Sequence, residues 1–78
     1  MKRHGRFSIS KVLLKTNPWM VQRVMSQCII FRAEYMYMGD VIEYHATSYR
    51  FDLVKAGEVA PEYVWEFDPE TDIEAVRL

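Results

Sequence analysis

The stretch that decides the fold is residues 29–47, which read IIFRAEYMYMGDVIEYHAT. Apolar and polar side chains alternate through residues 29–38 and again through 41–47, and Gly39-Asp40 separates the two runs. A period of two is typical of a half-buried strand, and a Gly-Asp pair is a turn signal. This stretch therefore predicts an antiparallel β-hairpin.

The alternation also predicts which face of this hairpin is buried. One face carries aromatic and small apolar side chains: Phe31, Ala33, Tyr35, Tyr37, Ile42, Tyr44 and Ala46. The opposite face is mixed and includes Arg32, Glu34 and Glu43. We expect the aromatic face to lie under the helices, an arrangement that leaves no exposed aromatic platform on which nucleic-acid bases could stack.

Upstream of the hairpin, the pattern changes to that of a helix. Asn17-Pro18 is a helix start, because Asn is a good N-cap and Pro is accommodated in the first turn. An apolar stripe at helical spacing follows: Met20, Val21, Val24, Met25 and Cys28. Residues 7–14, FSISKVLL, alternate at first and predict a strand with an end or a bulge near Lys11.

Two further elements are expected downstream. Ser48 can cap a short helix over residues 49–56 that stops at Gly57. Residues 62–67, EYVWEF, alternate as a strand that directs Tyr63, Trp65 and Phe67 inward. The order of elements is then strand, helix, strand, strand, short helix, strand.

This order predicts the α+β class, with a small antiparallel sheet and one main helix packed on one face. The ferredoxin-like β-α-β-β-α-β arrangement is the candidate topology. Three strands with a helix on one face are the alternative if residues 7–14 do not pair. We divide the chain into a basic flexible leader (1–6), a single α+β domain (7–67) and an acidic C-terminal segment (68–78).

Length and composition restrict the class of protein. Seventy-eight residues make one domain with a small core, so a homodimer is left open as a source of extra stability. No apolar run is long enough to span a bilayer, and residues 7–14 are too polar for a signal-peptide core. We expect a protein of the cytoplasm, or of the host cytoplasm if a phage encodes it.

Charge is divided unevenly along the chain. Residues 1–33 carry seven basic residues and no acidic one, whereas residues 34–78 carry eleven acidic and three basic ones. Such asymmetry is typical of two halves that attract each other or of a binding surface. The candidates for a surface that binds a basic protein patch are Glu58, Glu62, Glu66, Asp68, Glu70, Asp72 and Glu74. The candidates for contact with nucleic-acid phosphates are Lys2, Arg3 and Arg6.

No combination of residues predicts catalysis, a metal site or a cofactor. Glu43 and His45 share a strand face, but no third ligand or catalytic partner accompanies them, so a solvated pair is expected. Cys28 is the only cysteine, and its place on the apolar stripe predicts a buried, unreactive thiol. We therefore predict that the protein is no enzyme.

From the hairpin onward the chain carries a tyrosine strand that ends in Ala-x-Ser, then Phe-Asp, then Gly-Glu and Pro-Glu-Tyr. The positions are Tyr44, Ala46, Ser48, Phe51, Asp52, Gly57, Glu58, Pro61, Glu62 and Tyr63. This pattern resembles one in small uncharacterised accessory proteins of tailed bacteriophages. The resemblance implies a protein that binds a host component.

Together these features favour a non-enzymatic interaction module that acts in host takeover or against host defence. It is expected to bind a host protein through its acidic surface. The alternative is a nucleic-acid-binding regulator that uses the basic N-terminal part.

Overall fold

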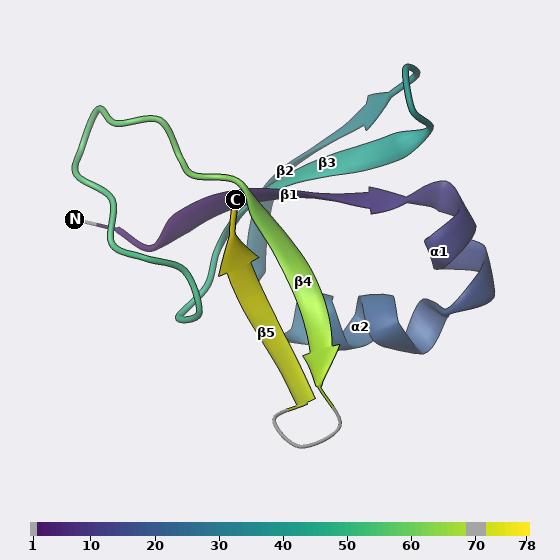
Figure 1. The fold of residues 1–78 in the computed structure, drawn as a ribbon. Coiled ribbons are helices and arrows are strands. Elements are labelled where there is room, and N and C mark those ends of the chain that lie inside the picture. Colours follow the sequence, from purple (N-terminus) through teal and green to yellow (C-terminus); the bar gives the residue numbers. More distant parts are fainter. Residues whose placement is uncertain (1, 69–71) are drawn as a thin grey trace.

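The computed structural model describes residues 2–68 and 72–78, with the side chains of Asp68 and Asp72 outside the described part. Its elements, in chain order, are β1 (His4–Ser10), α1 (Lys11–Thr16), α2 (Pro18–Ser26), β2 (Ile29–Met36), β3 (Val41–Thr47), β4 (Tyr63–Asp68) and β5 (Asp72–Arg77). They form a three-stranded antiparallel sheet in the order β1-β3-β2 and a β4–β5 hairpin (Figure 1). The predicted α+β class is confirmed.

The first half of the chain forms a split β-α-β unit. β3 lies between β1 and β2 and is antiparallel to both, while the two helices connect β1 to β2. β1 ends at Ser10 because the hydroxyl of this residue accepts the backbone N–H of Leu13 at 3.1 Å and so caps α1. The predicted strand end near Lys11 is thus confirmed, but residues 11–14 are helical.

The second half differs from the ferredoxin-like expectation. No helix forms over residues 49–56, because backbone groups of this segment bond to distant partners. Val54 and Lys2 exchange two backbone hydrogen bonds, of 2.8 and 3.1 Å, and the N–H of Asp52 donates to the hydroxyl of Tyr63 at 2.8 Å. β4 then pairs with β5 in a separate hairpin rather than extending the first sheet.

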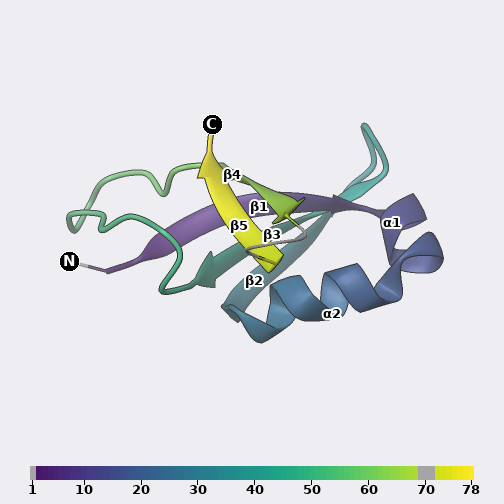
Figure 2. The same cartoon turned by 60° about the horizontal axis from the view of Figure 1, so that its bottom comes forward.

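The core lies between one face of the three-stranded sheet, α2 and the β4–β5 hairpin (Figure 2). Its buried apolar members are Phe7, Ile9, Val21, Val24, Ala46, Phe51, Tyr63 and Ile73. Phe51 stacks on Tyr63 with the ring centroids 4.4 Å apart, and Phe7 meets Trp65 edge-on at 5.7 Å. The predicted inward direction of Tyr63, Trp65 and Phe67 is confirmed by this packing.

The prediction for the aromatic face of β2 is wrong at Phe31. A bulge between Ile30 and Arg32 leaves Phe31 outside the strand register. Ile30 packs against the core, whereas Phe31 contacts the rings of His4 and His45 and is 57% exposed.

Beyond the bulge, Ala33 and Tyr35 pair with Tyr44 and Ile42 and return to the core side of the sheet. They are nevertheless exposed, because the turn end of the β2–β3 hairpin extends away from α2 (Figure 1). Tyr37, predicted to be buried, is 86% exposed.

Strands lie close to both ends of the described chain. Residues 4–6 are part of β1 and pair with β3. Residues 72–77 form β5, whose register with β4 runs from Tyr63 opposite Arg77 to Asp68 opposite Asp72. The charge pattern therefore coincides with strand pairing at 4–6 and at 72–77.

Candidate functional site

The outer face of the β4–β5 hairpin brings acidic side chains together. Facing residues of an antiparallel pair project on the same side, so the register places Glu66 directly opposite Glu74, with Val64 opposite Val76 beside them. Both glutamates are exposed, and Val64 is 43% exposed. We call Val64, Glu66, Glu74 and Val76 the acidic hairpin face.

The structure places the other predicted acidic residues in different settings. Glu62 is exposed just before β4, and Glu58 lies in a turn in which its N–H donates to the carbonyl of Lys55. Asp68 and Asp72 are opposite each other in backbone register. Glu70 lies outside the described residues.

The acidic hairpin face has no cation of its own among the described side chains. Arg77, the basic residue of β5, alternates to the opposite side, opposite Tyr63. Its guanidinium contacts the carboxylate of Asp52 at 3.3 Å. Like charges directly opposite in a sheet are destabilising, so Glu66 and Glu74 cost the isolated hairpin stability.

The basic residues predicted to contact nucleic acid have partners within the chain. Arg3 donates from Nη1 to the carbonyl of Phe51 at 2.7 Å, and Arg6 donates from Nε to the carbonyl of Ala60 at 2.9 Å. The backbone of Lys2 pairs with Val54. These residues attach the long segment before β4 to β1 and do not form a free arm.

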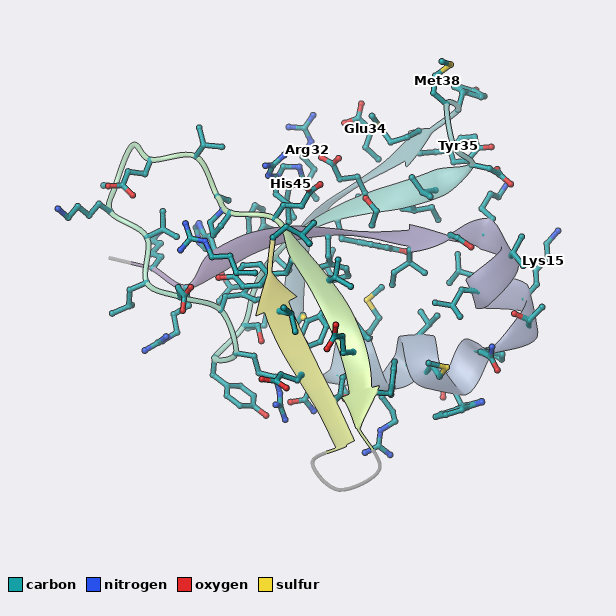
Figure 3. The ribbon with its side chains drawn as sticks, viewed as in Figure 1. Lys15, Arg32, Glu34, Tyr35, Met38 and His45 are labelled. Atoms are coloured by element: carbon teal, nitrogen blue, oxygen red, sulfur yellow. The ribbon has the colours of Figure 1, made fainter. Side chains whose placement is uncertain are left out.

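The sheet face turned away from α2 carries an aromatic and histidine cluster that the sequence reasoning missed. Phe31 lies 5.1 Å from the ring of His4 and 6.4 Å from the ring of His45. Figure 3 shows Arg32, Glu34 and His45 on this side of the sheet. His45 Nε2 lies 3.1 Å from Glu43 Oε1, and both side chains are partly buried, whereas a solvated pair was predicted. Phe31 lies on this face because of the bulge in β2, and no residue in the sequence indicates that bulge.

The turn end of the β2–β3 hairpin is a second exposed region. Tyr35 donates a hydrogen bond of 2.6 Å to Asp40 Oδ1, and this bond raises the pKa of the tyrosine hydroxyl. Lys11 places its Nζ 4.6 Å from the centre of the Tyr35 ring. Met38, at the turn, is 92% exposed and projects into solvent (Figure 3).

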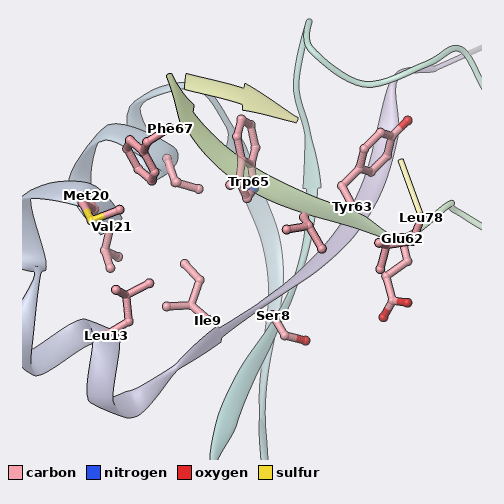
Figure 4. A pocket seen from close by; sticks show the side chains of 12 residues that line it. Ser8, Ile9, Leu13, Met20, Val21, Glu62, Tyr63, Trp65, Phe67 and Leu78 are labelled. Carbon is pink, nitrogen blue, oxygen red and sulfur yellow. The ribbon is translucent and has the colours of Figure 1, made fainter. Parts of the chain in front are cut away.

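An apolar cleft of about 250 Å³ lies between the helices and β4. In Figure 4, Leu13, Met20 and Val21 face Trp65 and Phe67 across it, with Ile9 at its base. The indole Nε1 of Trp65 is buried and has no hydrogen-bond partner within residues 2–68 and 72–78. An unpaired buried N–H is unfavourable, so this indole is a local weak point of the packing.

Cys28 follows α2 and is half-buried against the core. Burial raises the pKa of its thiol to about 11, and a hydrogen bond with Ser48 opposes part of that shift. Because the thiolate is the reactive form, this environment makes the thiol a poor nucleophile at neutral pH, in line with the expectation from the sequence.

Comparison with protein-family models, with curated proteins and with solved structures finds no match for this chain. Over residues 2–68 and 72–78, no group of three or more His, Cys, Asp or Glu side chains is placed to hold a metal ion. In the same part of the chain, no helix combines the length and the apolar character needed to cross a membrane.

Proposed function

We propose that this protein is a non-enzymatic interaction module that binds a basic surface of a host protein through the acidic hairpin face. The resemblance to phage accessory proteins suggests a role in host takeover or in countering host defence. The observation that carries the proposal is the pair Glu66 and Glu74, which lie opposite each other and exposed.

The energetics of this pair support a binding role. A lysine at either position would replace repulsion by attraction across the strands, at no cost to the core. The chain instead keeps two carboxylates next to exposed Val64. A cationic partner would relieve the repulsion on docking, and the neighbouring valines would supply apolar contact.

The test is a comparison of two variants that each lose two exposed carboxylates. The protein and its variants are used to capture partners from a bacterial lysate, and the captured protein is then purified and its binding kinetics measured. Glu66→Gln/Glu74→Gln should slow association about tenfold, with a smaller effect at high salt. The matched control Asp40→Asn/Asp52→Asn changes two exposed carboxylates, in the β2–β3 turn and in the segment before β4, and should leave the rate within about twofold. Equal effects of the two pairs would refute a role for the hairpin face.

A second function, single-stranded nucleic-acid binding, is favoured by one observation. The bulge places Phe31 exposed between His4 and His45 on the open face of the sheet. An exposed aromatic ring on such a face can stack on a base, and neighbouring basic side chains can contact phosphates. This site differs from the basic N-terminal residues that the sequence predicts for nucleic-acid binding, of which Arg3 and Arg6 donate hydrogen bonds to carbonyl groups.

Fluorescence anisotropy with a labelled single-stranded oligonucleotide separates the two functions. If the open face binds nucleic acid, Phe31→Ala should weaken binding about tenfold or more, while Glu66→Gln/Glu74→Gln should leave it intact or strengthen it. If the protein-binding function holds, the oligonucleotide binds weakly and Phe31→Ala leaves partner binding unchanged.

A further inference from the structure

The three-stranded sheet has two edges, and the fold treats them differently. The edge formed by β1 is lined by the chain that leads to β4: the N–H of Arg6 donates to the carbonyl of Pro61 at 2.9 Å, and Lys2 pairs with Val54. β2 pairs with β3 on one side. Among the described residues, no segment pairs with its other side.

The free side of β2 has the properties of a pairing edge. A strand edge presents unpaired N–H and C=O groups that template another strand, and proteins usually block it with Lys, Pro or a covering segment. β2 contains neither Lys nor Pro. It exposes large apolar side chains, among them Phe31 at 57% and Tyr35 and Met36 at 39% each.

We propose that β2 is a dimerisation edge, on which β2 of a second copy of this chain pairs antiparallel to form a continuous six-stranded sheet. Two identical strands paired in this way are related by a two-fold axis perpendicular to the sheet. Facing residues project on the same side of the sheet. A residue of one copy therefore faces a residue of the other copy whose number differs from its own by zero or by an even number. In the regular part of β2 after the bulge, Arg32–Met36, the two-fold axis can pass beside one of three residues. These are Ala33, Glu34 and Tyr35, and each choice defines one register.

Charge selects among these registers. With Glu34 at the centre, the two copies of Glu34 oppose each other. With Tyr35 at the centre, Glu34 faces Met36 of the second copy. With Ala33 at the centre, Arg32 of each copy faces Glu34 of the other, which forms two opposite-charge pairs.

The Ala33 register is therefore the one whose charges are complementary on both sides of the axis. Arg32 and Glu34 already lie 3.3 Å apart within one strand and are more than half exposed, so neither is needed by the core. A short strand pairing buries less area than a standard stable interface, and we expect a dimer with a micromolar Kd. Such a dimer displays two acidic hairpin faces, but its formation does not depend on the proposed function.

Sedimentation velocity over a concentration series tests the dimer, and charge exchange tests its register. Arg32→Glu and Glu34→Arg each turn both pairs into like charges and should raise the dimer Kd about tenfold or more. The double variant Arg32→Glu/Glu34→Arg restores opposite charges and should recover the parent Kd to within about threefold. Mixing the two single variants should give a heterodimer, seen by native mass spectrometry, because the glutamates at both positions of one chain then face arginines at both positions of the other.

The mixing experiment excludes an effect within one chain, since neither single variant regains its own Arg–Glu pair. Lys55→Glu and Glu58→Arg make the same charge changes on an exposed segment away from β2 and should leave the Kd unchanged. Circular dichroism melting confirms that each variant is folded. A parent that stays monomeric up to about 1 mM, or single variants that dimerise as the parent does, would overturn the proposal.

Discussion

A residue without a side chain controls how the aromatic core packs. Gly5 is buried in β1, where a Cβ atom would lie 2.7 Å from Cδ2 of Phe51 and 2.8 Å from Cδ2 of Tyr63. Phe51 and Tyr63 stack on each other, so neither ring can move alone without disturbing the other. The close approach of these rings to the backbone therefore requires glycine at this position.

Gly5→Ala should destabilise the protein by about 1–3 kcal/mol, because the added methyl group overpacks the stacked rings. Urea unfolding followed by tryptophan fluorescence measures the effect. Ser8→Ala, at an exposed position of the same strand, should shift stability by less than about 0.5 kcal/mol. Equal unfolding midpoints for the two variants would show that the rings do not contact position 5 as described.

Trp65 offers a second test at the residue scale. Its ring lies 5.7 Å from both Phe7 and Phe51, so Trp65→Ala should cost about 3–5 kcal/mol. Trp65→Phe keeps an aromatic ring and removes the buried N–H that lacks a partner, so its cost should be only about 1–2 kcal/mol. Thermal melting by circular dichroism compares the two variants. A phenylalanine variant as unstable as the alanine variant would mean that the indole N–H is satisfied in solution.

At the scale of elements, the position of an aromatic side chain depends on what covers its strand. β2 and β4 both carry alternating aromatic residues, yet Tyr63 in β4 is 3% exposed and Tyr35 in β2 is 39% exposed. β4 packs over the core, whereas the turn end of the β2–β3 hairpin extends away from α2. Alternation defines two faces of a strand, and packing decides whether either face is buried.

Within the β4–β5 hairpin, Glu74→Lys should raise the free energy of unfolding by about 0.5–1 kcal/mol, because it converts the Glu66–Glu74 repulsion into an attraction. Chemical denaturation in urea at low salt measures this gain, which should shrink as salt screens the charges. The same substitution at Glu58, which lies in a turn outside the hairpin, should change stability by less than about 0.5 kcal/mol. An equal gain in the free energy of unfolding for Glu74→Lys and Glu58→Lys would mean that the change in net charge, and not the Glu66–Glu74 pair, causes the effect.

At the scale of the whole molecule, β1 connects the two layers of the fold. It pairs with β3 along its full length, from His4 opposite Thr47 to Ser10 opposite Val41. Arg3 and Arg6 also bond to carbonyl groups of the segment between β3 and β4. The basic first part of the chain thus holds the acidic second part through specific hydrogen bonds as well as through opposite charge.

Deletion of residues 1–6 should abolish cooperative unfolding. It removes residues 4–6 of β1, and it also removes the hydrogen bonds by which Lys2, Arg3 and Arg6 hold the segment before β4. In a domain of this size, the loss approaches the whole stability. Near-ultraviolet circular dichroism and the urea unfolding curve report the outcome. Lys2→Ala keeps the backbone pair with Val54 and should resemble the parent. A cooperative curve from the deletion variant would restore the view of residues 1–6 as a leader.

Sequence reasoning located the main helix, three strands and the acidic cluster, because each depends on local patterns of period, capping and charge. α2, β2, β3 and β4 all lie within a few residues of their predicted bounds. The Ser48 hydroxyl accepts the N–H of Arg50 at 3.2 Å, as a cap would, but the predicted helix over 49–56 does not form because Val54 exchanges backbone hydrogen bonds with Lys2. At the candidate site, the charges of Glu66 and Glu74 were visible in the sequence, but their direct opposition across two strands was not.

By itself, the sequence determined which segments alternate, where the chain turns and how charge is divided, since these properties involve neighbours a few positions apart. Only the tertiary structure decided that Phe31 faces outward, that residues 4–6 belong to β1 and that, within the described part of the chain, one edge of β2 has no partner strand. These outcomes arise from contacts between distant segments, such as Lys2 with Val54 and Arg6 with Pro61. A local sequence pattern cannot predict these contacts, because the free energy of each contact depends on a partner that is distant in the sequence and comes close only on folding.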